Sequence, residues 1–187
     1  NASISNTSKF ENHKIENIVA NQLVGQGFHE IMTNSLTTDK YKLISKQLDP
    51  VNNVKILNPL SNDLSIMRQS LIFSGLETLA FNINRQQSDL KLFEFGKTYH
   101  DFDDQKEEFN HLSILITGNK TEKRWNSKKT EVGYFYLKGL VTGIFDRLGI
   151  KKFKSLPLSN DIFSEGQQLS VGKHSLVEFG SLKTNAL

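Results

Sequence analysis

The stretch from Asn58 to His100 constrains the fold most, because it carries signals for four consecutive elements. Pro59 lacks a backbone donor, and residues 61–63 (Ser-Asn-Asp) favour local side-chain bonds, so a turn is predicted there. A short strand then leads into a helix. The apolar residues of this helix recur at helical spacing and predict one buried stripe: Leu76, Leu79, Ala80 and Ile83.

The two ends of this helix carry further signals. Ser74 precedes Glu77 by three residues, which is the spacing of a capping box at a helix start. The run from Leu90 to Tyr99 is rich in apolar and aromatic residues and predicts a second strand. Gly96 interrupts this run, which predicts a strand with a bend or a bulge, or the start of a hairpin.

The rest of the chain continues the alternation of helices and strands. Helices are predicted at 9–24, 38–45 and 133–148, and strands at 28–36, 54–57, 109–118, 153–156, 168–171 and 175–182. In the first helix the stripe consists of Ile15, Ile18, Val19 and Leu23. Short turns between neighbouring strands favour an antiparallel sheet flanked by helices, which is an α+β fold. Residues 101–108 are predicted to form a solvated hairpin tip, and residues 121–130 a polar loop anchored by Trp125.

Composition excludes several classes of protein. The chain has no cysteine, so disulfides, thiolate chemistry and cysteine-bound zinc are excluded. A net charge of +3 is too weak to indicate nucleic-acid binding by itself. No apolar run reaches membrane-spanning length and no leader opens the chain, so a cytoplasmic location is predicted. The missing initiator methionine predicts that the chain is a piece of a longer protein. Residues 1–8 are predicted to be a polar lead-in or cloning remnant. Residues 9–187 are predicted to form one domain, truncated at its C-terminus.

Arg68 and Glu94 are the most suggestive charged residues, because each lies inside a largely apolar strand. They are interpreted either as a paired charge in a cleft or as an ion pair that fixes strand register or meets a partner chain. The second interpretation is favoured, since buried charges need partners whether or not chemistry occurs. No catalytic, cofactor-binding or metal-binding residue is predicted. The histidines are scattered, without ligand spacing: His13, His29, His100, His111 and His174.

Basic residues offer a third possibility. Arg85 and a downstream cluster are placed either to contact phosphates or to lie on solvated surface. The cluster consists of Lys120, Lys123, Arg124, Lys128 and Lys129. A nucleic-acid-binding module therefore stays open as an alternative, and affinity for tRNA that fell steeply with salt would indicate it.

Several motifs together resemble the catalytic-like domain of the beta subunit of bacterial phenylalanyl-tRNA synthetases. The matching segments are Asn58–Leu71, Gly75–Arg85, Leu92–Gly96, Gln26–Ile31 with Asn34–Leu36, and Tyr134–Gly139. The resemblance runs from about residue 9 to the end. It implies a class II aminoacyl-tRNA synthetase-like fold, with residues 9–36 in the place of motif 1 and Leu90 to Tyr99 in the place of the first strand of motif 2.

Active class II enzymes carry an arginine two residues before the motif 2 glutamate, where it grips the ATP α-phosphate. Glu94 is present here, but Leu92 stands two residues before it. An aliphatic side chain cannot make a bidentate, charge-assisted contact to phosphate. The glycine- and arginine-bearing motif 3 is also absent from the sequence. The resemblance therefore implies a domain of this fold that has lost catalysis.

The resemblance also implies a setting for the domain. By this resemblance, the whole enzyme would join phenylalanine to tRNA(Phe) with ATP and Mg²⁺. It would be a heterotetramer of two alpha and two beta chains. This domain would support the alpha subunit through residues 9–36. The alternative is a free-standing class II synthetase-like domain that binds ATP and activates an amino acid, with Arg68 or Arg85 in place of the missing cation. The sequence leaves open whether the domain touches tRNA and how the isolated chain associates.

Overall fold

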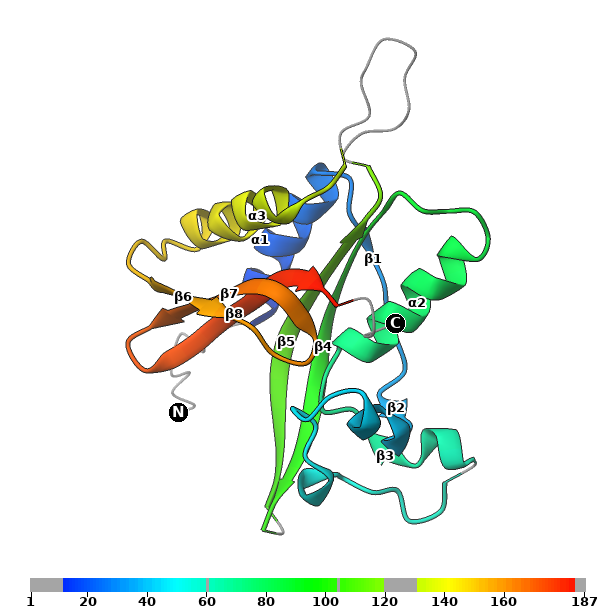
Figure 1. Ribbon diagram of the computed structural model, residues 1–187. Helices are drawn as coiled ribbons and strands as arrows, with labels where there is room; N and C mark the ends of the chain where they lie inside the picture. The colour runs from blue at the N-terminus through cyan, green and yellow to red at the C-terminus, as the bar shows by residue number, and fades with distance from the viewer. Residues whose placement is uncertain (1–11, 60, 104, 120–130, 184–187) are drawn as a thin grey trace, which may run out of the picture.

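The computed structural model describes residues 12–59, 61–103, 105–119 and 131–183 (Figure 1). The elements within these ranges are α1 (Asn12–Gly25), β1 (His29–Glu30), β2 (Leu36–Thr37), η1 (Asp39–Leu43), η2 (Pro50–Asn52), η3 (Asn62–Leu64), β3 (Ile66–Met67), α2 (Ile72–Ile83), β4 (Leu90–Phe102), β5 (Gln105–Thr117), α3 (Tyr134–Arg147), β6 (Lys154–Leu158), β7 (Phe163–Val171) and β8 (His174–Leu182). The elements labelled η are 3₁₀ helices.

The long hairpin of β4 and β5 is the axis of the molecule. Each strand has 13 residues, and the two pair antiparallel along their whole length. The short strand β1 adds to the other edge of β4 in parallel, opposite Leu92 and Phe93. Because successive side chains of a strand point to opposite faces, the hairpin presents two apolar faces that both need cover.

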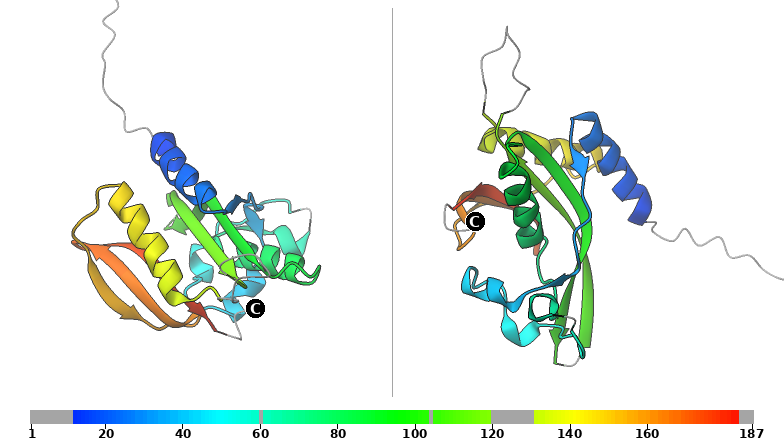
Figure 2. Two further views of the ribbon diagram at one scale, coloured as in Figure 1. Left: turned by 90° about the horizontal axis from the view of Figure 1, so that it is seen from above. Right: turned by 90° about the vertical axis from the view of Figure 1, so that its right-hand side faces the viewer.

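Helices cover both faces of this hairpin, as Figures 1 and 2 show. On one face the Phe93 ring packs with Leu23 of α1 and Leu140 of α3. On the other face Leu92 packs with Leu79 of α2. Each of the three helices therefore turns a buried apolar stripe toward the hairpin.

A second sheet, in the order β6-β7-β8, lies against the same helix α3. Leu140 and Ile144 of α3 face the β4–β5 hairpin, whereas Val141 and Phe145 pack with Phe179 of β8. One helix therefore supports two sheets at once. A third, two-stranded sheet of β2 and β3 lies with the 3₁₀ helices near the far end of the hairpin (Figure 1).

The predicted strand at 28–36 is wrong over most of its length. Only His29 and Glu30 pair with β4, and Leu36 belongs to a different sheet. Between them the chain leaves the edge of β4 and turns the backbone carbonyls of Thr33 and Asn34 toward the Arg68 side chain. The predicted strand at 54–57 is reduced to a single bridge, Lys55 to Ile66. At Thr33 and Asn34, side-chain partners therefore replace the ladder that the sequence pattern indicated.

The predicted capping box is also wrong, because α2 begins before Ser74. The Ser74 hydroxyl donates to the carbonyl of Leu71 at 3.2 Å and lies 2.9 Å from the hydroxyl of Thr33. Glu77 does not reach back to the helix start, since its carboxylate accepts a hydrogen bond from the Tyr41 hydroxyl. The two side chains of the predicted capping box therefore bond to residues distant in the chain, Ser74 to Thr33 and Glu77 to Tyr41.

Burial along the helices differs from the predicted stripes at three positions. Ala80 and Ile83 of α2 are exposed, whereas Phe73 is buried together with Leu76 and Leu79. In α1 the predicted Ile18 is exposed, while Val19 and Leu23 are buried.

Other predictions are confirmed. The α+β class, the first and last helices and the last strand agree with the structure within a few residues. The predicted tip at 101–108 does lie at the end of a hairpin, but most of it is paired strand, since β4 runs to Phe102 and β5 begins at Gln105. The predicted strand at 168–171 is the second half of β7, which begins at Phe163. Thr38 caps a short helix by accepting from the Lys40 amide at 3.3 Å. The predicted loop at 121–130, with Trp125, lies outside the described residues. None of the helices in the described ranges has the length and apolar character needed to cross a bilayer.

Candidate functional site

Arg68 and Glu94 form an ion pair in the interior, although they come from separate elements. Arg68 follows β3 and Glu94 lies in β4, and Arg68 Nη1 is 2.8 Å from Glu94 Oε1. Arg68 is 5% exposed and Glu94 is 1% exposed. Such a pair has to be satisfied by hydrogen bonds on every side, because desolvating two charges costs several kcal/mol per ion.

Nearby segments supply further hydrogen bonds to Arg68 Nε and Nη1 and to both carboxylate oxygens of Glu94. Arg68 Nε donates to the carbonyl of Lys97 at 2.9 Å, and Nη1 lies 2.8 Å from the Thr33 hydroxyl. The Thr33 hydroxyl donates to Glu94 Oε2 at 2.7 Å, and the Thr33 amide donates to Oε1 at 3.2 Å. The network therefore joins the β1–β2 connection, β3 and β4, and through Ser74 it also contacts α2.

Gly96 is required by this pair and not by a bend in the strand. A Cβ atom at position 96 would lie 2.5 Å from Arg68 Nη2 and 2.8 Å from a methyl group of Leu71. The β4–β5 register passes Gly96 opposite His111 without a shift, so the predicted bulge is wrong, whereas the alternative of a hairpin start is confirmed, since β4 is the first strand of the hairpin. The glycine leaves the space that the guanidinium occupies.

Leu92 occupies an apolar environment on the same face of β4 as Glu94. It is 5% exposed and packs with Leu76 and Leu79 of α2 and with Leu115 of β5. A cation at this position would be buried among hydrocarbon without a counter-ion, which is strongly unfavourable. This part of the hairpin face does not fit a triphosphate.

Arg85 lies apart from the buried pair. It is exposed beyond the end of α2, with its guanidinium carbon 3.4 Å from the centre of the Phe81 ring. Its Nη1 donates to the Phe81 carbonyl at 2.9 Å, so the side chain folds back onto its own helix. The structure therefore brings Arg68 and Glu94 together and leaves Arg85 outside their network.

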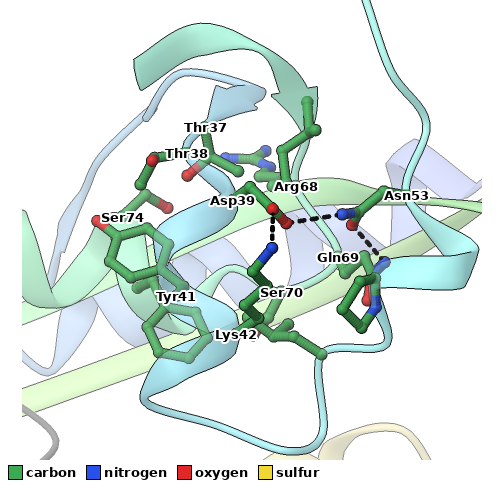
Figure 3. Close-up of a pocket in the computed structure, with 14 residues that line it drawn as sticks. Thr37, Thr38, Asp39, Tyr41, Lys42, Asn53, Arg68, Gln69, Ser70 and Ser74 are labelled. Atoms are coloured by element: carbon green, nitrogen blue, oxygen red, sulfur yellow. Dashed lines mark hydrogen bonds and ion pairs between the residues drawn. The ribbon is translucent and has the colours of Figure 1, made fainter. Parts of the chain in front are cut away.

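A small pocket lined by both polar and apolar side chains lies beside Arg68 (Figure 3). Its volume of about 20 Å³ is room for one water molecule and no more. Asp39 accepts hydrogen bonds from Lys42 and, at 2.9 Å, from the Asn53 side chain, while Gln69 donates to Asn53 at 2.8 Å. The bond from Lys42 lowers the pKa of Asp39. These contacts hold the turns around β3 together, and no spacing in the sequence predicted them.

Tyr41 closes one side of this pocket. Its ring stacks on Phe73 of α2 with centres 4.6 Å apart, and its hydroxyl donates to Glu77. Burial, together with the negative charge of Glu77, raises the pKa of the Tyr41 phenol above its usual range. The tyrosine is thus held as a neutral donor that ties η1 to α2.

Two histidines share one face of the β4–β5 hairpin. Burial lowers the pKa of His100 and of His111, the nearby His100 charge lowers that of His111 further, and Glu107 opposes the shift at His100. His100 also lies 3.3 Å from the Thr98 hydroxyl. Within the described ranges, no three His, Asp or Glu side chains converge in a way that would hold a metal ion. The basic cluster of residues 120–129 lies outside those ranges.

Comparison with known proteins gives one consistent result. The family model described as the phenylalanyl tRNA synthetase beta chain CLM domain matches residues 1–186. The phenylalanine–tRNA ligase beta subunit of Bacteroides fragilis is 40% identical over 183 residues, which are 91% of this chain and 22% of the relative. That of Fusobacterium nucleatum is 32% identical over 180 residues, 93% of this chain and 22% of the relative. The chain therefore spans about a fifth of the length of these curated relatives.

Solved structures agree on the fold. The pyrrolysyl-tRNA synthetase of Desulfitobacterium hafniense superposes with a TM-score of 0.62 at 20% sequence identity. The match covers 89% of this chain and 55% of that one. The predicted class II synthetase-like fold is confirmed by this likeness.

Proposed function

Because the chain belongs to the family of phenylalanyl-tRNA synthetase beta chain CLM domains, we propose that it is a non-catalytic structural domain of the beta subunit of a phenylalanine–tRNA ligase. In this role the domain holds the alpha subunit in place while that subunit attaches phenylalanine to tRNA(Phe). The proposed holoenzyme consists of two alpha and two beta chains, uses ATP and Mg²⁺, and acts in the cytoplasm. No cofactor is assigned to this chain itself.

The burial of Leu92 is the observation that carries the non-catalytic role. In the class II pattern the residue two positions before the motif 2 glutamate grips a phosphate, and here it packs beneath α2. Arg68 does not replace the missing cation, because its charge is paired with buried Glu94 at 2.8 Å. Its Nη1 and Nε also bond to the Thr33 hydroxyl and to the Lys97 carbonyl. Arg85 is held on Phe81 at the surface. Catalysis of adenylate formation by electrostatic stabilisation would need a cation aimed at the reacting phosphate.

The contact with the alpha subunit is proposed to lie on α1 and the segment after β1. Apolar side chains are exposed there on a folded surface, namely Ile18, Val24 and Met32. Met32 is 95% exposed, and so large an exposed apolar side chain beside other exposed apolar residues is typical of a surface that binds a partner. Replacing Met32 with Asp should weaken co-purification of the alpha subunit, whereas Leu57→Asp, at a comparably exposed residue outside this surface, should not.

The decisive experiment compares two double variants in the assembled ligase. Arg68→Met with Glu94→Gln removes both buried charges, and Lys97→Met with Glu108→Gln removes an exposed pair on the same hairpin. Phenylalanine-dependent ATP–pyrophosphate exchange, measured per assembled complex, should stay within about twofold of the parent for both variants, since neither pair stabilises the transition state.

A loss of about a hundredfold or more confined to the buried-pair variant would refute the structural role, because that is the size of a lost transition-state contact. The purified chain alone should show no such exchange. Phenylalanine-dependent exchange by the chain alone, or micromolar ATP affinity by calorimetry, would favour the amino-acid-activating alternative.

A further inference from the structure

The outer end of the β4–β5 hairpin carries three aromatic rings on one face. His100 and Phe102 lie two residues apart in β4, so their side chains point to the same side of the ribbon. Phe109 of β5 is directly opposite Thr98, which places its ring on that face too. The His100 ring is parallel to that of Phe102 and meets the Phe109 ring edge-on, with ring centres 5.6 Å apart in both contacts. These three rings form one continuous surface, called here the tip platform.

The tip platform is open to solvent. Phe102 is 40% exposed and Phe109 is 41% exposed, and neither belongs to a hydrophobic core cluster of the described residues. The tip lies at the end of the molecule away from α3 (Figure 1). Aromatic side chains are enriched at protein interfaces relative to the rest of the surface, and they often serve there as anchors. The platform is therefore suited to contact with a partner.

Charge differs between the two faces of the tip. On the face away from the rings, Lys97 pairs with Glu108 at 2.6 Å, and Asp101 is directly opposite Lys106 in the strand register. On the platform face, Glu107 is directly opposite the histidine of the platform. Within the described residues, no lysine or arginine forms an ion pair with Glu107. The platform face therefore combines aromatic rings with a negative charge that is not neutralised.

These features select a cationic partner. Residues 101–108 contain five acidic residues and one lysine, although the whole chain has a net charge of +3. Burial lowers the pKa of His100, so its ring is neutral at pH 7 and adds no positive charge. The negative tip repels the phosphates of RNA and of anionic lipid. A purely apolar partner is also disfavoured, because it would bury Glu107 without a counter-ion.

An arginine side chain matches both parts of this face. Its planar guanidinium stacks on aromatic rings and bonds to a carboxylate through two parallel donors. Lysine offers a point charge without the plane or the fork. We propose that the tip platform, together with Glu107, binds an arginine presented by a partner protein. The proposal concerns a surface separate from α1 and does not depend on the non-catalytic role.

Photocrosslinking in the full-length beta subunit, within its native assembly, identifies what covers the platform. A benzophenone amino acid replaces Gln105, which is exposed and directly opposite Phe102 on the platform face. The matched control replaces Lys106, the next residue, which is also exposed. We expect position 105 to crosslink to an arginine-bearing segment of another protein. Position 106 should give at least about fivefold less of this product, because successive side chains of a strand point to opposite faces.

Substitutions then test the chemistry of the contact. Glu107→Gln and Phe102→Ala should each lower the affinity of the beta subunit for the crosslinked protein about tenfold or more, since each removes one part of the arginine site. Glu108→Gln, on the other face, should change this affinity less than about twofold. Glu107→Arg combined with Arg→Glu at the crosslinked arginine of the partner should restore most of the affinity that either change alone removes.

The location and the chemistry can each fail. Equal crosslinking from positions 105 and 106, or no crosslink from either, would overturn the proposal. A crosslink to RNA, to lipid, to a second beta chain, to another part of the same chain or to a protein segment without arginine would also overturn it. An affinity that Glu107→Gln leaves unchanged would refute the ion pair on which the proposed contact depends.

Discussion

Replacing Arg68 with Met tests whether the buried pair organises this part of the fold. The substitution keeps much of the side-chain volume but removes the cation 2.8 Å from Glu94 and the bond to the Lys97 carbonyl. Glu94 then keeps only the two hydrogen bonds from Thr33 at 2.7 and 3.2 Å. A carboxylate that is 1% exposed is left without a counter-ion.

The size of the effect follows from this geometry. Breaking a buried pair by removing one partner costs about 3–5 kcal/mol. Because Thr33 still satisfies part of Glu94, the lower end applies, about 3 kcal/mol of unfolding free energy. For a domain of this size each kcal/mol shifts the melting temperature by about 2–4 °C, which gives a fall of roughly 6–12 °C.

Urea and thermal unfolding, followed by circular dichroism, measure this effect. Adding Glu94→Gln to Arg68→Met should restore part of the loss, since the stranded charge is gone. Lys97→Met is the control, because Lys97 and Glu108 form an exposed pair at 2.6 Å, and it should leave the melting temperature nearly unchanged. A loss below 1 kcal/mol for Arg68→Met, or a double variant no more stable than the single one, would contradict the reasoning.

Three further predictions concern the same hairpin. Gly96→Ala should destabilise the domain by about 1–3 kcal/mol in urea unfolding, because the new methyl group meets the fixed Arg68. The control is Gly139→Ala in α3, where an added Cβ atom meets nothing within 4 Å, and this substitution should stabilise the domain by up to about 1 kcal/mol. Equal effects of Gly96→Ala and Gly139→Ala would refute the steric argument. Stability should be constant above about pH 6.5 and fall as the pH drops below it. The reason is that partial desolvation lowers the pKa values of His100 and His111 in the folded protein, so the unfolded chain binds more protons in this range. The urea midpoint at pH 7.5 and 5.5 checks this, and a double His→Gln variant with an unaltered slope would exclude these two residues as its source. Leu92→Ala should cost about 2–5 kcal/mol through the cavity it leaves under α2, whereas a change below 1 kcal/mol would show that Leu92 is not packed as described.

Local patterns in the sequence predicted the elements that depend on periodicity. The 3.6-residue spacing in α3 and the alternation in β5 are sustained, and both elements were placed within a few residues. The capping box failed because Thr33 and Tyr41, which are distant in the chain, bind Ser74 and Glu77. No local rule contains such partners, since they exist only once the tertiary fold brings the segments together.

The candidate site, like the fold, could be predicted from the sequence only in part. Two charges inside apolar strands indicated that Arg68 and Glu94 need partners, and the structure places them together. The role of Thr33 was not predictable, because a threonine in an apparent strand carries no signal of a distant carboxylate. Gly96 was interpreted as a feature of the backbone. In the structure it is a glycine because the side chain of Arg68, 28 positions earlier in the chain, occupies the space that a Cβ atom would need.

The order in which the network's members occur along the chain has a consequence for synthesis on the ribosome. Thr33 and Arg68 emerge before Glu94, which lies 61 residues after Thr33. Until β4 has left the exit tunnel, the Arg68 guanidinium lacks its partner Glu94, and Thr33 lacks its hydrogen bonds to that carboxylate. Residues 29–71 of the nascent chain should therefore stay open to proteases and chaperones until the hairpin is complete, and then close in one cooperative step.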